Sequence, residues 1–561
     1  MTCERATVHG VPIAVLQLDL SWAFDRVSHD FLLQLLQWCE VRKFTIQWIS
    51  ICYRELTTSL VVNGRSTRSI AVKRSVRQEC PLSPILFALY LEPICRIIEA
   101  DSTITGMKCE AGEVKLLAYA DDVTLICTSK ESIERATQEI QRFCKLSGAL
   151  LNWEKTKGAW LGDWDETPTR YMGATWSTQV DTYLGVPFNQ ERQFSGGEMW
   201  STRLNKLKAS LTVWNGRYVS TLNRSIICNV SLYPAVLYYA QARVCSGPTT
   251  HRIHRIFATF IWRSRMEKMR RTNLFHSRLR GVFQVMNVAV KLVVHRFMLF
   301  RSEKNGHFWE TLQSLGAAYL LLWIATTAVL PKKNPALGFY KDVAEAVRFL
   351  TDRFSWDYLS TGNRRKLYWD IIDVVFPSPL YRSSLSNRKD SDVSSKVTGM
   401  PIPTWIKDCF VLFHTDTLPV KTWKHAKGFI VPWSLRCDSC FAEQETPVHV
   451  FLNCRNAVQF WGEARYVAEV DSPFQWEQLK FLDFKDDARR ELVEVIAVVG
   501  MHSLWAYRQD YVNCKENIST PWSRFVTTLL WTIELVNSSE YYEVDGLLRL
   551  KERLMRNSYS F

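Results

Sequence analysis

The fold of the N-terminal part of this chain is decided by the stretch Leu117-Ala118-Tyr119-Ala120-Asp121-Asp122-Val123-Thr124-Leu125-Ile126. An apolar run leads into two adjacent carboxylates, and a second apolar run follows them. This pattern predicts two short strands joined by a tight turn, with Asp121 and Asp122 at the tip of a β-hairpin. Adjacent carboxylates repel each other, so such a tip is costly unless a cation neutralises it. An ordinary acidic turn is the alternative that these residues alone leave open.

A second strand-like segment, residues 12–18, ends directly before Asp19, and residues 25–36 then take on helical periodicity. A carboxylate at a strand end can face the Asp121–Asp122 tip from a neighbouring strand. Three carboxylates around one point would form a Mg²⁺ site, because this ion takes hard oxygen ligands and is normally completed by substrate phosphates. Two such ions about 3.5–4 Å apart can activate an attacking hydroxyl and stabilise a leaving oxygen.

Length and composition are those of a globular protein with roughly two to four domains. Of the 561 residues, 47% are apolar and 22% are charged, which excludes wholesale disorder. The 15 Cys are irregularly spaced and no secretory signal precedes the first motif, which favours reduced thiols in an intracellular protein, nuclear or cytoplasmic. The apolar run at 315–330 is shorter than the roughly 20 residues that span a bilayer, so we expect a buried helix there.

The net charge of +14 is concentrated in one segment. Between Ser201 and Lys304, nineteen Lys/Arg stand against two acidic residues, a local net charge of +17 that exceeds the net charge of the whole chain. Such a segment is typical of a surface that binds a polyanion, and a merely solvated basic face is the alternative. The aromatic residues interleaved with these charges are Trp214, Phe257, Phe260, Trp262 and Phe275.

Three motifs carry a resemblance to a known family. They are Leu18-Asp19 with Ala23-Phe24-Asp25-Arg26-Val27, then Arg77-Gln78-x-Cys80-Pro81-Leu82-Ser83-Pro84-x-Leu86-Phe87, and finally Tyr119-Ala120-Asp121-Asp122. In this order and spacing they resemble the reverse transcriptase of non-LTR (LINE-type) retrotransposons, which makes the ordinary acidic turn the weaker interpretation. Further segments resemble the family's Asn-x-x-Lys motif, primer-gripping hairpin and helical thumb: 147–157, 183–186, and 214–238 with 260–262.

The resemblance implies an RNA-directed DNA polymerase that transfers a nucleotide from a dNTP to a primer 3′-hydroxyl on an RNA template. The catalytic residues would bind two Mg²⁺ ions, with the Leu20 carbonyl as a further ligand; they are Asp19, Asp121 and Asp122. Contacts to nucleotide and primer–template would come from Phe24, Arg77, Gln78, Tyr119 and Lys155. Phe24 would lie beneath the incoming sugar and exclude a 2′-hydroxyl, and core packing is its alternative role. Lys155 would approach the triphosphate, with a solvated surface lysine as the alternative.

Three features depart from the family pattern. Only 18 residues precede Asp19, so we expect an N-terminally truncated chain that lacks the family's fingers. Glu79 stands where the family usually has Gly, which lets the backbone approach a ligand closely, and Trp22 stands where a Lys is common. These departures predict impaired polymerase activity. They also leave open a second function, that of a catalytically inactive nucleic-acid-binding remnant of the same element.

A second metal site is predicted far downstream, where Cys437, Cys440, His449 and Cys454 offer four ligands of the kind that tetrahedral zinc prefers. Four protein ligands leave no position open for chemistry, so we expect a structural Zn²⁺. Buried cysteines with a chance histidine are the alternative. The flanking residues resemble the zinc-binding domain that follows non-LTR reverse transcriptases, with a role in folding and nucleic-acid contact; they are 418–423, 445–451 and Trp461.

Together these expectations give a domain plan. Residues 1–190 are expected to form the α/β palm of a right-hand polymerase, a ferredoxin-like antiparallel sheet with helices. The segments that follow would be a basic α-helical thumb at 191–305, a helical connector with a Ser-rich linker at 306–399, a zinc-binding domain at 400–465 and a helical C-terminal region at 466–561. The partners would be an RNA template, a DNA primer or target and dNTPs, without a membrane.

Overall fold

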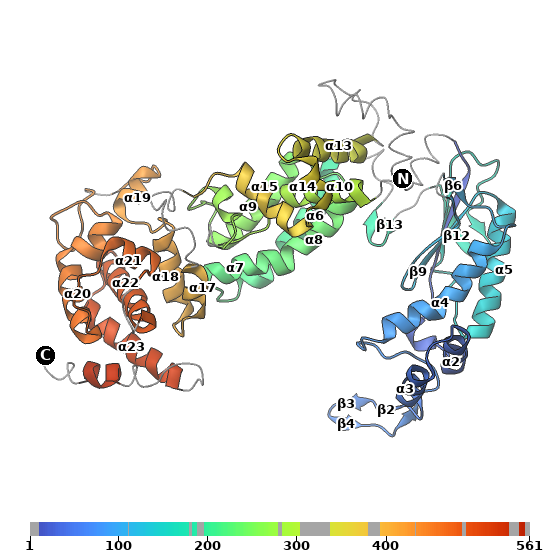
Figure 1. The fold of residues 1–561 in the computed structure, drawn as a ribbon, viewed down its shortest axis with the longest axis horizontal. Helices are drawn as coiled ribbons and strands as arrows, with labels where there is room; N and C mark the ends of the chain where they lie inside the picture. Colours follow the sequence, from blue (N-terminus) through green and yellow to red (C-terminus); the bar gives the residue numbers. More distant parts are fainter. Residues whose placement is uncertain are drawn as a thin grey trace. The chain divides into compact units, whose positions relative to one another are not determined.

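The computed structural model describes residues 10–109, 112–178, 182–187, 196–278, 283–302, 337–379, 393–431, 434–484, 490–537 and 549–555. Figure 1 labels the elements of these ranges along the chain. The chain divides into two compact units, Met1–Met199 with Phe297–Phe349 and Trp200–Arg296 with Leu350–Phe561. The expected buried helix at 315–330 lies outside the described residues. No helix within the described ranges is long and apolar enough to cross a membrane.

A six-stranded sheet forms the centre of the first unit, with the strand order β11-β12-β10-β1-β9-β8. β1 is central and runs antiparallel to both β10 and β9, whereas β10 and β12 are parallel. The sheet is therefore mixed, which corrects the expectation of a wholly antiparallel sheet. Its strands are β1 (Ile13–Leu18), β8 (Leu116–Tyr119), β9 (Asp122–Cys127), β10 (Lys157–Leu161), β11 (Arg170–Tyr171) and β12 (Ala174–Ser177).

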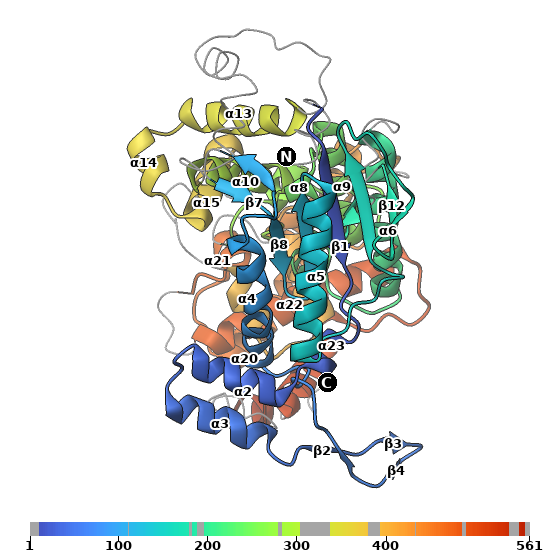
Figure 2. The same cartoon turned by 90° about the vertical axis from the view of Figure 1, so that its right-hand side faces the viewer.

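Both faces of this sheet are apolar, because alternate residues along a strand point to opposite sides. In β1, Ala14, Leu16 and Leu18 are buried in one core, and Ile13 and Val15 are buried in another on the opposite face. Helices α2, α4 and α5 contribute to the first core, and Figure 2 shows α4 and α5 side by side along the strands. These helices are α2 (His29–Trp38), α4 (Ser83–Ala100) and α5 (Lys130–Ser147).

Residues 42–77, between α2 and α4, form an extension that we call the arm. Asn63 and Gly64 make the two-residue turn at its tip, and both have positive φ (50° and 77°), as a type I′ turn requires. Figure 2 shows β3 and β4 projecting away from the sheet. The elements of the arm are α3 (Lys43–Tyr53), the pair β2 (Thr57–Thr58) and β5 (Ile70–Ala71), and the hairpin β3 (Val61–Val62) and β4 (Arg65–Ser66).

Smaller elements complete the part of the first unit that lies before residue 188. They are the 3₁₀-helix η1 (Ala23–Arg26) and the hairpins β6 (Met107–Cys109) with β7 (Gly112–Val114) and β13 (Thr182–Tyr183) with β14 (Val186–Pro187). After β14 the described part of the chain contains helices and no strand. The first of these helices cover the expected thumb: α6 (Gly196–Asn215), α7 (Thr221–Ile227), the π-helical turn η2 (Cys228–Leu232), α8 (Tyr233–Ala242), α9 (Gly247–Trp262), η3 (Arg271–Leu274) and α10 (Val288–Ser302).

One hydrophobic core joins the expected zinc-binding domain to the helices that follow it. Phe460 of α20 packs in the same cluster as Ile496 of α22 and Phe525 of α23. The segments 400–465 and 466–561, expected as separate regions, therefore share a core. The helices from 337 onward are α13 (Leu337–Thr351), α14 (Trp356–Thr361), α15 (Arg364–Val375), α17 (Val393–Gly399), α18 (Thr404–His414), α19 (Lys421–Ala426), η4 (His449–Asn453), α20 (Arg455–Ala468), α21 (Trp476–Phe481), α22 (Arg490–Val512) and α23 (Pro521–Asn537).

The expected Ser-rich linker is helical at its C-terminal end. Residues 380–392 lie outside the described ranges, but Val393–Gly399 form helix α17. Val393 and Val397, four residues apart and hence on one side of the helix, are buried in the C-terminal core. Packing against this core therefore overrides the loop-forming composition of the segment.

Candidate active site and metal centre

The predicted carboxylate hairpin is formed by β8 and β9. Tyr119 pairs with Asp122, so that Ala120 and Asp121 alone make the turn. Ala120 has a φ of 51°, the left-handed conformation that a two-residue hairpin turn needs at its first central position. The predicted hairpin is present, with Asp121 in its turn, but Asp122, which the sequence pattern also placed at the tip, is the first residue of β9.

The central strand β1 brings a third carboxylate to this hairpin. Leu18 pairs with Val123 in the antiparallel β1–β9 ladder, so the next residue, Asp19, lies beside Asp122 on the adjacent strand. Burial, followed by the charges of Asp121 and Asp19, raises the pKa of Asp122. The three residues therefore form an anionic site whose mutual repulsion a cation would relieve.

The backbone of Asp19 is held by the segment that follows α5. The Asp19 carbonyl accepts a hydrogen bond from the Asn152 N–H at 2.8 Å, and the Asp19 N–H donates to Thr156 Oγ1 at 3.4 Å. Thr156 is fully buried, and its hydroxyl donates to the Asn152 carbonyl at 2.7 Å. Leu20 continues the contact through a β-bridge to Leu151. Asn152 and Thr156 thus position the strand end that carries Asp19, a role that sequence reasoning missed.

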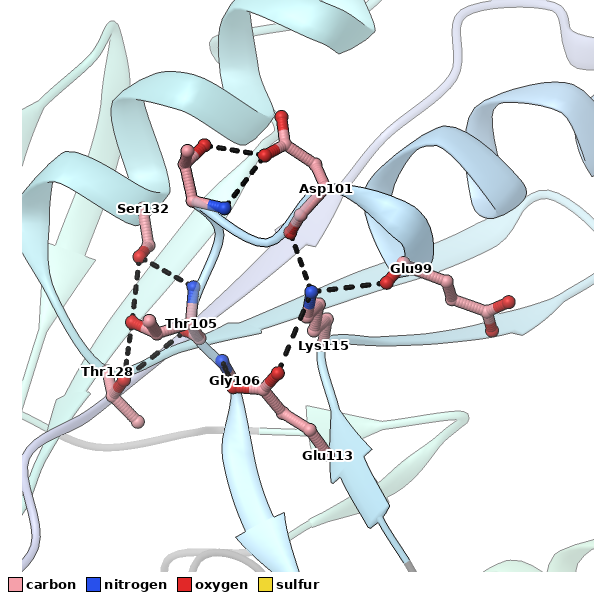
Figure 3. A network of polar contacts seen from close by, with 9 residues as sticks. Glu99, Asp101, Thr105, Gly106, Glu113, Lys115, Thr128 and Ser132 are labelled. Atoms are coloured by element: carbon pink, nitrogen blue, oxygen red, sulfur yellow. Dashed lines mark hydrogen bonds and ion pairs between the residues drawn. The ribbon is translucent and has the colours of Figure 1, made fainter.

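A buried lysine anchors the start of the carboxylate hairpin. Lys115 Nζ donates to the carbonyls of Glu99 at 3.1 Å and Asp101 at 2.7 Å, at the C-terminal end of α4, and lies 3.6 Å from Glu113 Oε2 (Figure 3). A cation is stabilising there because the last carbonyls of a helix have no partner within it. The Lys115 carbonyl accepts the Ile126 N–H of β9 at 2.7 Å. Lys115 therefore ties the hairpin to α4, and no local pattern in the sequence singles it out.

A backbone hydrogen bond joins the start of the second sequence motif to the first motif. The Val76 N–H donates to the Phe24 carbonyl at 2.8 Å. The Phe24 ring is partly buried and stacks on Phe87, with 4.6 Å between the ring centroids. Arg77 and Gln78 follow Val76 directly and are exposed. The structure thus brings these three candidate nucleotide-contacting residues into neighbouring segments, and it also gives Phe24 the packing role that was its alternative.

Glu79 adopts a left-handed backbone conformation, with a φ of 61°. This conformation costs a residue with a Cβ about 1–2 kcal/mol, because the Cβ approaches a carbonyl oxygen. Glycine has no Cβ and avoids this cost. The turn itself therefore explains why glycine is the usual residue at this position. Glu79 both strains the turn and adds an exposed carboxylate to it.

Two further candidate residues are accessible on the surface. Tyr119, the last residue of β8, is 68% exposed. Lys155 is exposed in the turn that Asn152 begins, where its N–H donates to Asn152 Oδ1 at 3.2 Å. Neither side chain belongs to a core, so both can reach a ligand.

The hairpin predicted to grip a primer also lies at this end of the sheet. Tyr183 pairs with Val186 across its two-residue turn. Gln17 Nε2 of β1 donates to the Thr182 carbonyl at 2.9 Å. Burial and the charge of Asp122 raise the pKa of Tyr183. Tyr183 therefore lies within electrostatic reach of the carboxylates.

The four predicted zinc ligands converge in the C-terminal region. The ligand atoms of Cys437, Cys440, His449 and Cys454 all lie within 4.8 Å of one another, and three of the four residues are buried. Among the residues that the structure describes, this is the single His/Cys/Asp/Glu group assembled so closely. Three thiolates and an imidazole are a ligand set that suits tetrahedral zinc and leaves no position for a substrate.

Polar neighbours orient these ligands. His449 Nδ1 lies 3.0 Å from Glu443 Oε2, and His449 Nε2 faces Cys440 Sγ at 3.2 Å. A carboxylate at one ring nitrogen fixes the tautomer in which the other nitrogen can bind a metal. Ser439 Oγ lies 3.2 Å from Cys437 Sγ. Glu443 and Ser439 are thus supporting residues that the Cys/His spacing does not reveal.

A buried ion-pair network joins this centre to helix α22. Glu445 is fully buried, pairs with Arg508 of α22 and accepts the Lys421 N–H at 2.9 Å. Lys421 Nζ in turn lies 2.5 Å from Asp438, between the first two cysteines. Because loss of one partner would leave an uncompensated buried charge, the network holds the ligand loop against the helical core.

Comparison with known protein families gives a match in the N-terminal part of the chain. Residues 5–188 match the family model described as reverse transcriptase (RNA-dependent DNA polymerase). The chain carries a reverse transcriptase domain. The matched residues include Asp19, the carboxylate hairpin and the segment that holds the Asp19 backbone, so the reverse transcriptase domain coincides with the mixed sheet and its helices.

The relatives of this reverse transcriptase domain are retrotransposon proteins, which confirms the non-LTR resemblance. Over 260 residues the chain is 28% identical to the transposon TX1 uncharacterized 149 kDa protein of Xenopus laevis, covering 45% of this chain and 20% of that protein. Over 143 residues it is 32% identical to the retrovirus-related Pol polyprotein from type-1 retrotransposable element R2 of Popillia japonica, covering 25% and 20%. The chain thus spans about a fifth of the length of the curated relatives it matches.

Among solved structures, telomerase from Candida tropicalis in complex with a fragment of telomeric RNA matches at 14% sequence identity. The match covers 60% of this chain and 49% of that chain, with a TM-score of 0.28. At this score the likeness carries no argument about the fold, which rests on the family match and on the sheet itself.

Proposed function

We propose that this chain is the RNA-directed DNA polymerase part of a non-LTR retrotransposon protein, which extends a primer 3′-hydroxyl with dNTPs on an RNA template. The observation that carries the proposal is the meeting of Asp19, Asp121 and Asp122 at one end of the sheet, where burial, followed by the charges of Asp121 and Asp19, raises the pKa of Asp122. This end lies within the segment that matches the reverse transcriptase family. The family match does not favour the alternative of an inactive remnant.

Asp19, Asp121 and Asp122 would hold Mg²⁺, with the Leu20 carbonyl as a further ligand. Carboxylate oxygens are the hard ligands that this ion prefers, and its charge would offset the repulsion among the three acids. The three aspartates are not gathered as closely as the Cys/His ligands, and a Mg²⁺ site is normally completed by substrate phosphates. When bound, two such ions activate the attacking hydroxyl and stabilise the leaving oxygen.

The side chains around the carboxylates would position the reactants, since phosphoryl transfer needs placement and charge neutralisation more than covalent help from the protein. Phe24 would support the sugar of the incoming nucleotide, and the exposed Arg77 and Gln78 would contact the nucleotide and the template. Lys155 would approach the triphosphate as a positive charge. Tyr119, at the tip of the carboxylate hairpin, would contact the primer end.

The second unit would bind the nucleic acid and one structural Zn²⁺. The basic segment 201–304 presents arginines against aromatic rings: Arg217 lies 5.0 Å from the centre of the Trp214 ring, and Arg263 lies 5.7 Å from that of Tyr218, which is 75% exposed. Exposed arginine–aromatic pairs suit phosphate and base contacts. The Zn²⁺ at the Cys/His group would stabilise the helical region beside this segment without taking part in the reaction.

Incorporation of labelled dNTPs on a primed RNA with Mg²⁺ tests the proposal. Asp121→Asn should lower the rate by at least about a hundredfold, because a metal ligand stabilises charge that develops in the transition state. Asp165→Asn, at an exposed aspartate after β10, is the matched control and should leave the rate unchanged. Equal rates for Asp121→Asn and the wild type would contradict the proposal, as would a folded, RNA-binding wild type that does not extend the primer.

A further inference from the structure

A groove opens on the C-terminal helical region between helices α20, α22 and α23. These three helices contact one another, and Figure 1 shows them in the last part of the chain. The groove has a volume of about 640 Å³, and pockets that hold organic ligands have volumes of about 300–1,000 Å³. The described residues that line it belong neither to the Cys/His group nor to the carboxylate site. The groove is therefore a candidate site that the functions proposed above do not use.

Three aromatic rings contribute to the lining of the groove. On α20, positions 456, 459, 460 and 463 recur every three or four residues and so lie on one face. Phe460 of this face also packs in the core, and its ring centre lies 6.3 Å from that of Trp522 at the start of α23. Tyr507 of α22 adds the third ring. Aromatic faces attract cations, because their electron-rich surfaces carry partial negative charge.

Glu463 is the one charged residue among the described residues that line the groove. It is half-buried, accepts a long hydrogen bond of 3.4 Å from the Gln459 amide, and makes no ion pair within the described ranges. A basic residue of α23, Arg524, is already paired with Asp510. Because a partly desolvated carboxylate is costly without a cation, the groove favours a positively charged ligand.

We propose that this groove binds a lysine or arginine side chain from a basic segment of a partner protein. The charged group would pair with Glu463, and the stem of the side chain would lie against Trp522 and Tyr507. The groove is larger than one side chain, so the polar groups of Asn456 and Thr527 can contact the flanking peptide. A nucleic acid fits poorly, because its phosphates would meet a carboxylate and, among the described lining residues, no basic side chain.

Saturation-transfer NMR on the full chain with capped pentapeptides tests the proposal. The peptides carry a central arginine, lysine, citrulline or norleucine between glycine and alanine residues. Citrulline and norleucine keep the stem and lose the charge, so they should bind at least about fivefold more weakly than the arginine and lysine peptides. Raising the salt concentration should weaken binding of the charged peptides only.

Two variants separate the contribution of charge from that of the rings. Glu463→Gln keeps the shape of the side chain, so it should lower affinity for the arginine peptide at least about fivefold and abolish the preference over citrulline. Trp522→Ala should weaken binding of every peptide, and Trp522→Phe should restore most of it. Trp522 also packs against the C-terminal core, so the melting temperature is measured beside binding. Glu463→Gln alters a partly exposed residue and should retain the fold.

Matched controls lie on the same helical region outside the groove. Glu477→Gln removes an exposed carboxylate of α21. Trp531→Ala removes a ring that is 44% exposed on α23, the helix that carries Trp522. Both controls should leave peptide affinity unchanged. An arginine peptide with a photoreactive benzoylphenylalanine beside the arginine should crosslink within 456–463 or 520–527, and Glu463→Gln should reduce this crosslink.

Several results would overturn the proposal. They are equal binding of the arginine and citrulline peptides, wild-type affinity in Glu463→Gln, an equal loss in Glu477→Gln, or crosslinks confined to other segments. Tighter binding of a glutamate peptide or of a nucleoside triphosphate would identify an anion as the ligand. Binding of free arginine amide as tight as that of the peptide would identify a small amine instead of a protein segment. Asp121→Asn should bind the peptides like the wild type, because the groove does not depend on the polymerase reaction.

Discussion

The two candidate metal sites of this chain are built in opposite ways. In the C-terminal region, four ligand atoms already lie within 4.8 Å of one another, and Glu443 orients His449. In the reverse transcriptase domain, Asp19, Asp121 and Asp122 share one end of the sheet but are not gathered as closely as the Cys/His ligands. Burial, followed by the charges of Asp121 and Asp19, raises the pKa of Asp122. The comparison teaches that a structural site can be completed by protein ligands alone, whereas a site for phosphate chemistry must leave room for the substrate.

The supports of the two sites differ in the same way. The Cys/His group is surrounded by side-chain contacts, among them the buried pair Glu445–Arg508. The aspartates are placed through contacts to main-chain atoms of their strands and of helix α4: Thr156 and Asn152 hold the Asp19 backbone, and the Lys115 side chain anchors the hairpin to carbonyls at the end of α4. Changes to the closed site should therefore alter stability first, and changes to the open site should alter activity first.

Removing a ligand or the metal ion from the Cys/His group should have the largest effect on stability. Cys454→Ser, or chelation of the wild type, removes metal-binding free energy that is also folding free energy, on the order of 10 kcal/mol in small zinc domains. The shared core of α18, α20, α22 and α23 retains part of the stability, so we expect loss of one bound Zn²⁺ per chain and a clearly lower melting temperature of the helical region. Metal analysis and thermal denaturation measure both.

Two variants sharpen this result. Cys514→Ser changes an exposed cysteine outside the cluster and should leave metal content and melting unchanged. Glu443→Gln keeps all four ligands but removes the carboxylate at His449 Nδ1, and should weaken zinc affinity about 10- to 100-fold. An unchanged melting temperature in the metal-free wild type would show that the site is not structural.

The second-largest expected effect is a loss of stability of the helical unit at acidic pH. Burial, followed by the charges of Arg271 and His251, lowers the pKa of His254 to about 3, and its Nε2 accepts the Val288 N–H at 3.0 Å. At pH values between the lowered pKa in the folded chain and the ordinary pKa of 6.5, the His254 ring is protonated only when the chain is unfolded. The contribution of His254 is thus fully present above pH 6.5 and is lost as pH falls, by about 1.4 kcal/mol per pH unit.

Urea unfolding at neutral pH and near pH 5 measures this loss. His254→Gln removes the titrating group while keeping an acceptor for the Val288 N–H, so its stability should change less with pH than that of the wild type. The same slope in both proteins would mean that another group is responsible.

Loosening the support of the open site should have a smaller effect on stability and a visible effect on rate. Thr156→Val removes the hydroxyl that accepts the Asp19 N–H and donates to the Asn152 carbonyl, at a cost of about 1–3 kcal/mol for the unpaired groups. Because misplacement of a catalytic group slows the reaction, we expect about a tenfold lower kcat with little change in the KM for dNTP. Thr156→Ser should restore the wild-type rate in steady-state incorporation assays, and a wild-type kcat in Thr156→Val would contradict the assigned role.

The smallest effect concerns the strained turn beside the open site. Glu79→Gly relieves a left-handed conformation and removes a carboxylate near the expected polyphosphate, so the KM for dNTP should fall a few-fold. Stability should hardly change, because the gain of about 1 kcal/mol is offset by the greater freedom of glycine in the unfolded chain. Glu79→Gln removes the charge but keeps the strain, so the two variants separate the causes. A higher KM in Glu79→Gly would show that the side chain contributes to binding.

The sequence by itself determined the local parts of this protein. The carboxylate hairpin follows from two apolar runs around a short turn, and the Cys/His group follows from the spacing of its ligands. The three linked motifs were also sufficient for the reverse transcriptase domain, which the family match confirms. These features depend on residues close together in the chain or on motifs read in order, so a single sequence reveals them.

Only the tertiary structure decided how these parts are supported. Thr156 lies 137 residues from Asp19 in the chain, and Lys115 meets the end of α4 through packing, so no local pattern points to either. The parallel pair β10–β12 and the core shared by 400–465 and 466–561 likewise depend on strand register and side-chain packing between distant segments. The φ of Glu79 is decided by the turn around it. Sequence periodicity describes which faces are apolar, but the partner of each face emerges only when the whole chain is packed.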